Sequence, residues 1–217
     1  YKASAQVADK AMKRAIELCV VGADIYAVCQ EVDKLIESEL AETFNNKKTK
    51  KLERGIAFPT CISVNHVMGH YSPMSDESSQ LAEGDLAKID LGCHLDGFIA
   101  QVAHSVIVSA DLTAKITGPK ADAIMAAYTA MQAAQRKIAD AASSAAVTEV
   151  IAQVCTEFGV NPVEGVLSHK MERHVIDGND SIINKETVDM KVSEWAFAPG
   201  DVIGLDVYVS TGEGKPK

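Results

Sequence analysis

The sequence predicts an α+β fold made of two related halves, and three observations support this prediction. In the first fifty residues the apolar side chains recur with the spacing of helices, whereas from Gly55 onward the sequence contains apolar runs typical of β-strands. A nine-residue pattern, Glu83–Leu91, recurs at Pro199–Val207, and helical segments precede each copy. The composition, 47% hydrophobic and 24% charged over 217 residues, is typical of a soluble globular chain with a substantial core.

Two helices are expected in the first fifty residues. Apolar residues of the first recur at steps of three and four until Gly22 ends the pattern. The second follows Asp24, a residue type that caps helix N-termini by accepting a backbone N–H. The residues expected to face the core are Val7, Ala8, Ala11, Ala15 and Leu18 in the first helix and Ile25, Val28, Cys29, Val32, Leu35 and Ile36 in the second.

Three strands are expected next, at Ile56–Val64, Leu86–Leu91 and Gly97–Val108. The pair Asp96-Gly97 separates the last two strands. Because Asp-Gly accepts the left-handed backbone of a two-residue turn, it predicts a tight hairpin at this point.

The second half is expected to begin with a long helix. Thr117 is a candidate cap and Pro119 suits the first helical turn, and a further helix is expected from Val147 to Phe158, ended by Gly159. Val202–Val209 is predicted to be one strand. The inward stripe expected of the long helix consists of Ile124, Tyr128, Met131, Gln135 and Ile138.

The repeated pattern places two aspartates at equivalent positions. Each copy reads as a turn, Gly-Asp, a strand and then an aspartate, which is Asp90 in the first copy and Asp206 in the second. If the halves are related by a pseudo-twofold axis, these two carboxylates are expected to converge across it.

A hairpin turn at Asp96-Gly97 also fixes which residues face one another. Leu95 would lie opposite Phe98, and Asp90 and Gln101 would become diagonal neighbours on one face, about 7–8 Å apart at the backbone. Two carboxylates in these places could bridge a pair of divalent ions. Gln101, however, is a neutral amide that offers one weak carbonyl oxygen, so it cannot bridge two cations as an aspartate would.

The charge and the cysteines limit the functional classes. Thirty acidic residues against 21 basic ones give a net charge of −9, which argues against a surface that is basic all over but allows a local basic patch. Five cysteines without a Cys-x-x-Cys pair favour reduced thiols in a cytosolic or nuclear protein. No uncharged apolar run approaches the length of about 20 residues that a membrane span needs.

One segment, residues 45–54, concentrates positive charge without any apolar period. It reads either as a solvated loop or as a phosphate-binding tip, and its composition leaves both open. Its candidate nucleic-acid-binding residues are Lys47, Lys48, Lys50, Lys51 and Arg54.

Several segments resemble a known family, the type 2 methionine aminopeptidases, which have the pita-bread fold. Residues 89–99 read Ile-Asp-Leu-Gly-x-His-x-x-Gly-x-Ile and resemble the first metal-binding hairpin of that family. Residues 58–73, 165–169 and 205–212 resemble further pocket segments of that family. The resemblance implies two pseudo-symmetric halves, with helices packed outside a curved, mostly antiparallel sheet.

The resemblance implies roles for six pocket residues. Asp90 and His169 match metal ligands, and His70 matches the histidine that contacts the substrate. The other three depart from the family pattern: Gln101 replaces the bridging aspartate, Asp206 replaces a glutamate, and Asp177 replaces a second catalytic histidine. Losing the bridging carboxylate removes charge, geometry and the activated bridging hydroxide together. The pocket is therefore expected to be vestigial, with no catalytic residue, no bound metal and no cofactor.

Within the superfamily, the chain resembles the proliferation-associated, curved-DNA-binding branch, which has lost peptidase activity. Residues 55–60, 96–100, 102–104 and 174–178 carry this resemblance. It implies a ribosome-associated RNA-binding protein of the cytoplasm and nucleolus that partners the large ribosomal subunit and ribosomal RNA in ribosome maturation and translational control. The chain would then be a single pita-bread domain, residues 1–217, incomplete at both ends.

Three functional classes follow from these observations. The leading one is a catalytically silent protein that docks on the large ribosomal subunit or RNA. The alternative is an active divalent-metal methionine aminopeptidase, which Asp90 and His169 favour and which Gln101, Asp206 and Asp177 oppose. A third class, an interaction or transcription-associated module that binds peptides in the old substrate groove, is not separable from RNA docking by sequence.

Overall fold

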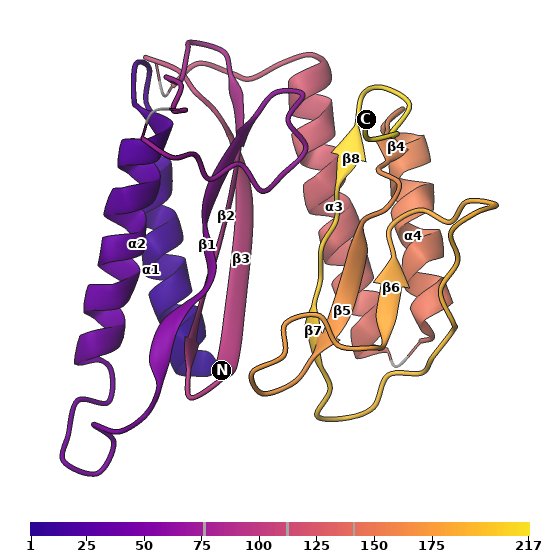
Figure 1. The fold of residues 1–217 in the computed structure, drawn as a ribbon. Coiled ribbons are helices and arrows are strands. Elements are labelled where there is room, and N and C mark those ends of the chain that lie inside the picture. Colours follow the sequence, from indigo (N-terminus) through magenta and orange to yellow (C-terminus); the bar gives the residue numbers. More distant parts are fainter. Residues whose placement is uncertain (76, 112, 141) are drawn as a thin grey trace. The chain divides into compact units, whose positions relative to one another are not determined.

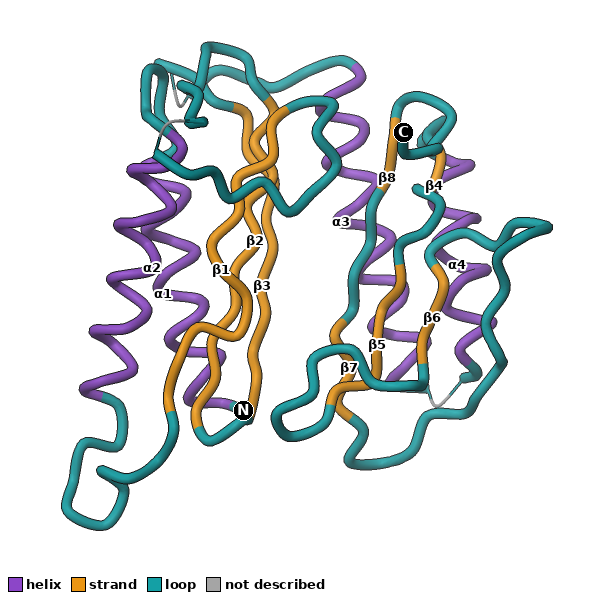
Figure 2. Tube along the Cα trace, in the orientation of Figure 1, coloured by secondary structure: helices purple, strands orange, loops and turns teal. Residues whose placement is uncertain are grey.

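The computed structural model describes residues 1–75, 77–111, 113–140 and 142–217. They form two compact units, Tyr1–Ala114 and Lys115–Lys217. Each unit combines two helices with β-strands (Figure 1; Figure 2), as the sequence predicted for two related halves. The assignment of the whole chain to one domain stays a prediction.

The first unit is a three-stranded antiparallel sheet with two helices. The strands lie side by side in the order β1-β2-β3. The elements are α1 (Lys2–Leu18), α2 (Ile25–Glu42), β1 (Arg54–Val64), β2 (Leu86–Leu95) and β3 (Phe98–Ile107). The second helix begins where predicted, because the Asp24 carboxylate accepts a hydrogen bond from the Ala27 N–H at 2.9 Å.

The core of the first unit lies between its helices and one face of its sheet. Strand β2 alternates buried and partly exposed residues, and Ala87, Ile89, Leu91 and Cys93 belong to the core that the helices share. The apolar stripes of α1 and α2 complete this core. The opposite face of the sheet is therefore left to carry polar side chains, and this face holds the candidate site.

The hairpin between β2 and β3 follows the sequence prediction. Asp96 and Gly97 both have positive φ, at 55° and 78°, as a two-residue turn of type I′ requires. Leu95 consequently pairs with Phe98, and the register continues without a shift to the far end of both strands. The pairing of β1 with β2 is less regular, with shifts on either side of Phe58.

The second unit contains α3 (Pro119–Ala139), α4 (Ser144–Glu157) and two small antiparallel sheets. One sheet has the order β6-β5-β7 and the other pairs β4 with β8. The strands are β4 (Asn161–Pro162), β5 (Leu167–Met171), β6 (Ser181–Ile183), β7 (Val202–Gly204) and β8 (Val209–Ser210). Residues of both helices, β6 and the segment after β7 form the core of this unit.

The inward stripe predicted for the long helix is wrong at two of its five positions, whereas Ile138 packs against the core. Tyr128 is 60% exposed, and Gln135 is also exposed. The residues of α3 that are buried against the α4 side of the core are the alanines Ala126, Ala130 and Ala134. Small side chains allow two helices to approach closely, and this contact replaces the larger apolar stripe that the sequence favoured.

Two boundaries in the second unit also differ from prediction. The long helix begins at Pro119 after Gly118, so Thr117 is not its cap. The strand predicted at Val202–Val209 is divided into β7 and β8. It is interrupted because the Asp206 N–H donates to the Ser168 hydroxyl at 2.8 Å instead of to a ladder carbonyl.

The five cysteines, Cys19, Cys29, Cys61, Cys93 and Cys155, are all free and buried. Among the helices in the described ranges, none has the length and apolar character that crossing a membrane requires.

Candidate functional site

The polar face of the β2–β3 hairpin carries the first part of the predicted pocket. Asp90 pairs with Ala103, and Gln101 pairs with Gly92, so Asp90 and Gln101 are diagonal neighbours on one face, as predicted. The Gln101 side chain lies close over Gly92, because a Cβ on Gly92 would stand 3.0 Å from Gln101 Cγ. This glycine thus leaves the space that the glutamine side chain occupies.

His70 reaches the same face through an aromatic contact. Its backbone is left-handed, with φ at 64°, and its ring meets the Phe58 ring edge to face at 5.4 Å. The Phe58 Cβ in turn lies 3.1 Å from the position of a Cβ on Gly92. Phe58 therefore connects His70 with the Gly92–Gln101 pair, and the first unit gathers three of the six predicted pocket residues around β2.

Lys88 is a residue of this face that the sequence analysis missed. It lies two positions before Asp90 on β2, between Ser63 and Ser105 of the neighbouring strands. Its ammonium donates to the Asn65 carbonyl at 3.0 Å, and burial lowers the pKa of Lys88 to about 8. Alternation along the strand places Lys88 on the Asp90 face, but sequence alone does not show that it is partly buried.

The other three pocket residues belong to the second unit. His169 lies on β5 between Ser181 of β6 and Gly204 of β7, and its Nδ1 is 3.2 Å from the Gly178 carbonyl oxygen. Since a carbonyl only accepts, this contact favours the tautomer that carries a proton on Nδ1 and leaves Nε2 as an acceptor.

Asp206 and Asp177 are held next to β5 in different ways. The Asp206 backbone is tied to Ser168, which precedes His169, by two hydrogen bonds of 2.8 and 3.2 Å. Asp177 is exposed in the bend before Gly178. The second unit thus brings Asp206, in the segment between β7 and β8, next to β5, which carries His169, with Asp177 in the connection between β5 and β6.

A pair of catalytic metal ions fits these residues poorly. Within the described ranges, no group of three or more histidine, cysteine, aspartate and glutamate side chains could hold a metal ion. On the hairpin face, the donors are one carboxylate, Asp90, and one amide, Gln101, whereas bridging two cations calls for anionic oxygens on both strands.

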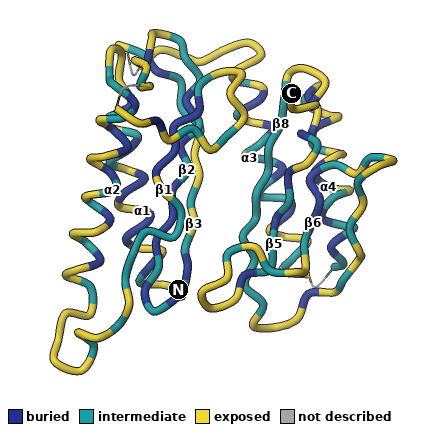
Figure 3. The backbone as a smooth tube through the Cα atoms, in the orientation of Figure 1, coloured by how far each residue is buried: buried dark blue, intermediate teal, exposed yellow. Residues whose placement is uncertain are grey.

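The basic segment forms a loop with internal hydrogen bonds between α2 and β1, at the lower left of Figure 1. Its four lysines, Lys47, Lys48, Lys50 and Lys51, are exposed (Figure 3). The Asn46 side chain accepts from the Lys48 and Thr49 N–H groups at 3.0 and 3.2 Å. None of the ion pairs in the part of the chain that the structure describes includes these lysines. Their charges consequently face solvent.

Arg54 differs from the lysines with which the sequence grouped it. Its Nη2 donates to the carbonyls of Thr43, Phe44 and Thr49 at 3.2, 3.4 and 3.3 Å, and its Nε is buried without a hydrogen-bond partner. The guanidinium therefore closes the loop from within. Nothing in the sequence separates this inward arginine from the four outward lysines, because all five lie in one polar run.

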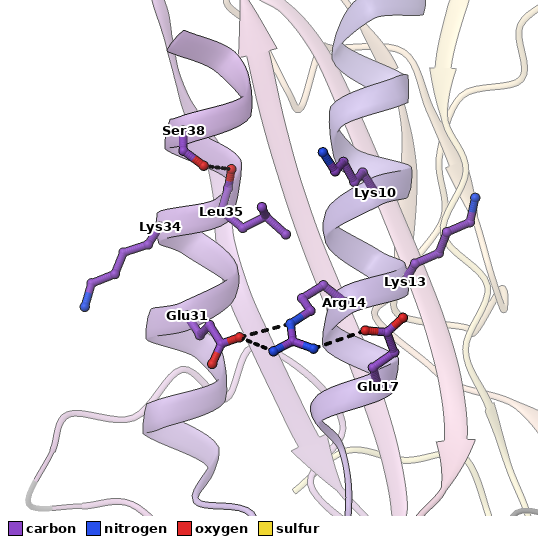
Figure 4. A pocket seen from close by; sticks show the side chains of 8 residues that line it. All are labelled: Lys10, Lys13, Arg14, Glu17, Glu31, Lys34, Leu35 and Ser38. Atoms are coloured by element: carbon purple, nitrogen blue, oxygen red, sulfur yellow. Dashed lines mark hydrogen bonds and ion pairs between the residues drawn. The ribbon is translucent and has the colours of Figure 1, made fainter. Parts of the chain in front are cut away.

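A shallow groove of about 510 Å³ on the outer side of α1 and α2 also carries cations (Figure 4). Arg14 bridges Glu17 and Glu31, and its pKa is raised by hydrogen bonds to Glu31 and then Glu17. Lys10 pairs with Glu39 and Lys13 with Asp9. Because most of its cations are neutralised within the chain, this groove is a weaker phosphate-binding candidate than the loop.

Comparisons with known proteins agree with this description. Residues 1–215 match metallopeptidase family M24. The chain is 44% identical over its full length to proliferation-associated protein A of Dictyostelium discoideum and 39% identical to the curved DNA-binding protein of Schizosaccharomyces pombe. It covers 56% and 57% of these two proteins, so it spans about half the length of the curated relatives it matches.

A solved structure also shares the fold. The structure of a thermophilic Arx1 superposes with a TM-score of 0.88 at 28% identity, over 99% of this chain and 63% of that protein. The pita-bread fold class and the resemblance to the proliferation-associated, curved-DNA-binding branch are thereby confirmed.

Proposed function

The chain belongs to metallopeptidase family M24. We propose that it is a non-enzymatic member of this family that binds RNA on the large ribosomal subunit. The observation that carries the loss of catalysis is that the diagonal neighbour of Asp90 on the hairpin face is an amide, Gln101. A neutral amide cannot compensate two divalent cations, and without them the hydroxide that attacks a peptide bond is not generated. What remains is a scaffold that can hold partners.

RNA binding is supported by the basic loop. Four exposed lysines on one loop offer a phosphate backbone several point charges without reading bases, which suits contact with ribosomal RNA. The name of the Schizosaccharomyces pombe relative, a curved DNA-binding protein, also points to nucleic acid. Ribosome maturation, translational control and a place in both cytoplasm and nucleolus follow from the branch resemblance and belong to this proposal.

Charge reversal of the lysines tests the RNA-binding role. The variant with Lys47, Lys48, Lys50 and Lys51 changed to Glu should bind RNA and large ribosomal subunits more weakly. Because each lost phosphate contact removes about 0.7 from the slope of log K against log salt for single strands, four contacts should flatten it by about 3. Co-sedimentation and RNA binding at several salt concentrations measure both effects.

A matched control separates the loop from net charge. Lys115, Lys137, Lys191 and Lys215 are also exposed, and changing these four to Glu alters the net charge by the same amount. This control should bind as the wild type does, apart from a small non-specific loss. Equal losses in both variants, or no loss in the loop variant, would remove the role of the loop.

An active divalent-metal aminopeptidase is the second candidate, and the state of His169 favours it. With Nδ1 facing the Gly178 carbonyl, Nε2 has the lone pair that metal-binding histidines use. Incubation with Co²⁺ or Mn²⁺ and a Met-Ala-Ser peptide distinguishes the two candidates. Release of methionine at ordinary enzyme rates would overturn the non-enzymatic proposal.

A further inference from the structure

Phe44 has an unusual conformation for a large side chain. It follows Thr43, the C-cap residue of α2, its φ is +53°, and 53% of the residue is exposed. The left-handed backbone region suits glycine and asparagine, whereas a bulky residue there is an outlier that the surrounding structure must enforce. The exposed ring belongs to neither apolar core.

The loop enforces this conformation through the Phe44 carbonyl. This oxygen accepts from the Asn46 N–H at 3.0 Å, from Arg54 Nη2 at 3.4 Å and from the Thr49 hydroxyl. Arg54 also donates to the carbonyls on either side of the turn, those of Thr43 and Thr49. The backbone of Phe44 is therefore fixed from inside the loop, and its ring is left at the surface.

The Phe44 ring lies in the same loop as the four exposed lysines. Lys47, Lys48, Lys50 and Lys51 follow it within seven residues, and the Asn46 side chain holds the backbone at Lys48. An exposed aromatic ring beside several unpaired cations is the combination that single-stranded nucleic acid requires, because a base stacks on the ring while its flanking phosphates meet the cations. A flexible loop would lose part of that affinity as ordering entropy.

We propose that Phe44 is a stacking platform for an unpaired RNA base, and that Arg54 positions it by closing the loop. This inference rests on the proposed RNA-binding function and specifies its ligand as single-stranded RNA, since the faces of paired bases are covered by their neighbours. The four lysines contact the phosphates on either side of the stacked base. Arg54 acts through the loop backbone and touches no RNA.

The variants that test Phe44 must respect its backbone. Phe44→Asn removes the ring but accepts the left-handed conformation, whereas Phe44→Tyr keeps an aromatic face. Binding of the full chain to a single-stranded RNA oligonucleotide and to its duplex is measured over a range of salt concentrations. Phe44→Asn should weaken single-strand binding by about 5- to 100-fold with an unchanged salt slope, because a stacking contact releases no counterions. Phe44→Tyr should bind within about twofold of the wild type.

Two further measurements test stacking by the ring and the positioning role of Arg54. In Phe44→Trp, stacking of a base on the new ring should quench its fluorescence when the single strand is added. Arg54→Gln should weaken single-strand binding with a salt slope like that of the wild type, and should speed tryptic cleavage after Lys47–Lys51 without RNA. A flatter slope in Arg54→Gln would instead make Arg54 a direct phosphate contact and overturn its positioning role.

The outcomes separate this inference from the proposed function. If charge reversal of the four lysines abolishes RNA binding while Phe44→Asn binds as the wild type does, stacking is wrong and RNA binding by the loop stands. If neither variant loses RNA binding, both ideas fall. If Phe44→Asn keeps full affinity for the oligonucleotide but loses co-sedimentation with ribosomes, the ring contacts protein, and the stacking role is overturned.

Discussion

Asp85 and Asp201 accept corresponding hydrogen bonds in two copies of one turn. Asp85 Oδ2 accepts from the N–H three residues earlier, that of Ala82, at 2.9 Å, and Asp201 Oδ2 accepts from Ala198 in the same way at 2.8 Å. Each remaining carboxylate oxygen binds a side chain of another segment, Asn65 in the first unit and Lys170 in the second. A strand begins directly after each turn, so the sequence repeat reflects a repeated local structure.

Replacing Asp85 by Ala should therefore destabilise the first unit. The change removes the acceptor of the Ala82 N–H and the contact with the Asn65 amide, and a comparable loss of a cap costs about 1–2 kcal/mol in the free energy of unfolding. Asp85→Asn, which keeps one acceptor oxygen, should fall between Asp85→Ala and the wild type. Chemical denaturation measures the difference, with Asp9→Ala as the control, because Asp9 forms an exposed ion pair with Lys13. Equal stability of Asp85→Ala and Asp9→Ala would contradict this role.

Sequence reasoning succeeds where local chemistry determines the structure. The start of α2 and the hairpin turn depend on local chemistry, at Asp24 and Asp96-Gly97, and both were predicted correctly. Once that turn is known, strand alternation determines the register, which is why sequence reasoning alone places Asp90 and Gln101 on one face. The functional roles of these residues stay predictions.

Sequence reasoning fails where tertiary contacts decide. The buried stripe of α3 consists of alanines because α4 approaches closely, and hydropathy alone favours larger residues such as Tyr128. Arg54 was grouped with the lysines because its inward direction depends on carbonyls that come from the end of α2 and the loop. The left-handed backbone of Phe44 likewise depends on these contacts, and its own residue type argues against it.

Gly92→Ala should disturb the candidate pocket by crowding. The new Cβ would lie 3.0 Å from Gln101 Cγ, 3.1 Å from Phe58 Cβ and 3.2 Å from the Ala100 carbonyl oxygen. Overpacking of this kind costs about 1–3 kcal/mol in the free energy of unfolding. Gly212→Ala is the matched control, since its Cβ would meet nothing nearer than the Ser210 hydroxyl at 3.6 Å. Thermal melting should show a lower Tm for Gly92→Ala alone; a Tm equal to that of the control would mean that Gln101 and Phe58 move aside freely.

The buried thiols predict a loss of stability in alkali. Burial, with a smaller contribution from Asp33, raises the pKa of Cys29 to about 12 from an ordinary value near 9. Between these values the unfolded chain releases its thiol proton while the folded chain keeps it, so the stabilising contribution of Cys29 is complete below pH 9 and falls as the pH rises. Lys88 acts in the opposite direction, because its lowered pKa makes the folded state more stable as the pH rises above about 8.

A difference measurement isolates the thiol. Cys29→Ala should be less stable than the wild type at pH 8 because it leaves a cavity. This deficit should shrink at pH 10, because ionisation of the Cys29 thiol in the unfolded chain destabilises only the wild type. Lys88 is common to both proteins and cancels. Denaturation in the presence of a phosphine reductant supplies the free energies. A deficit that is the same at both pH values would show that Cys29 ionises in the folded chain as it does in the unfolded one.

Thr60 joins α2 to the irregular part of β1. Its N–H and its hydroxyl both donate to Asp33 Oδ1, at 3.0 and 2.6 Å, and Thr60 is fully buried. Thr60→Val keeps the shape but removes the hydroxyl donor, so a partly buried carboxylate oxygen loses one of two hydrogen bonds, at a cost of about 1–2 kcal/mol in the free energy of unfolding. Thr60→Ser keeps the donor and should lose less stability, because it lacks only the methyl group.

Hydrogen exchange tests the same contact. Because the register shift between Phe58 and Cys61 lies at this contact, amide hydrogen exchange in β1 should also rise in Thr60→Val and stay low in Thr60→Ser. Unchanged exchange in Thr60→Val would show that strand pairing alone holds the bulge, without Asp33.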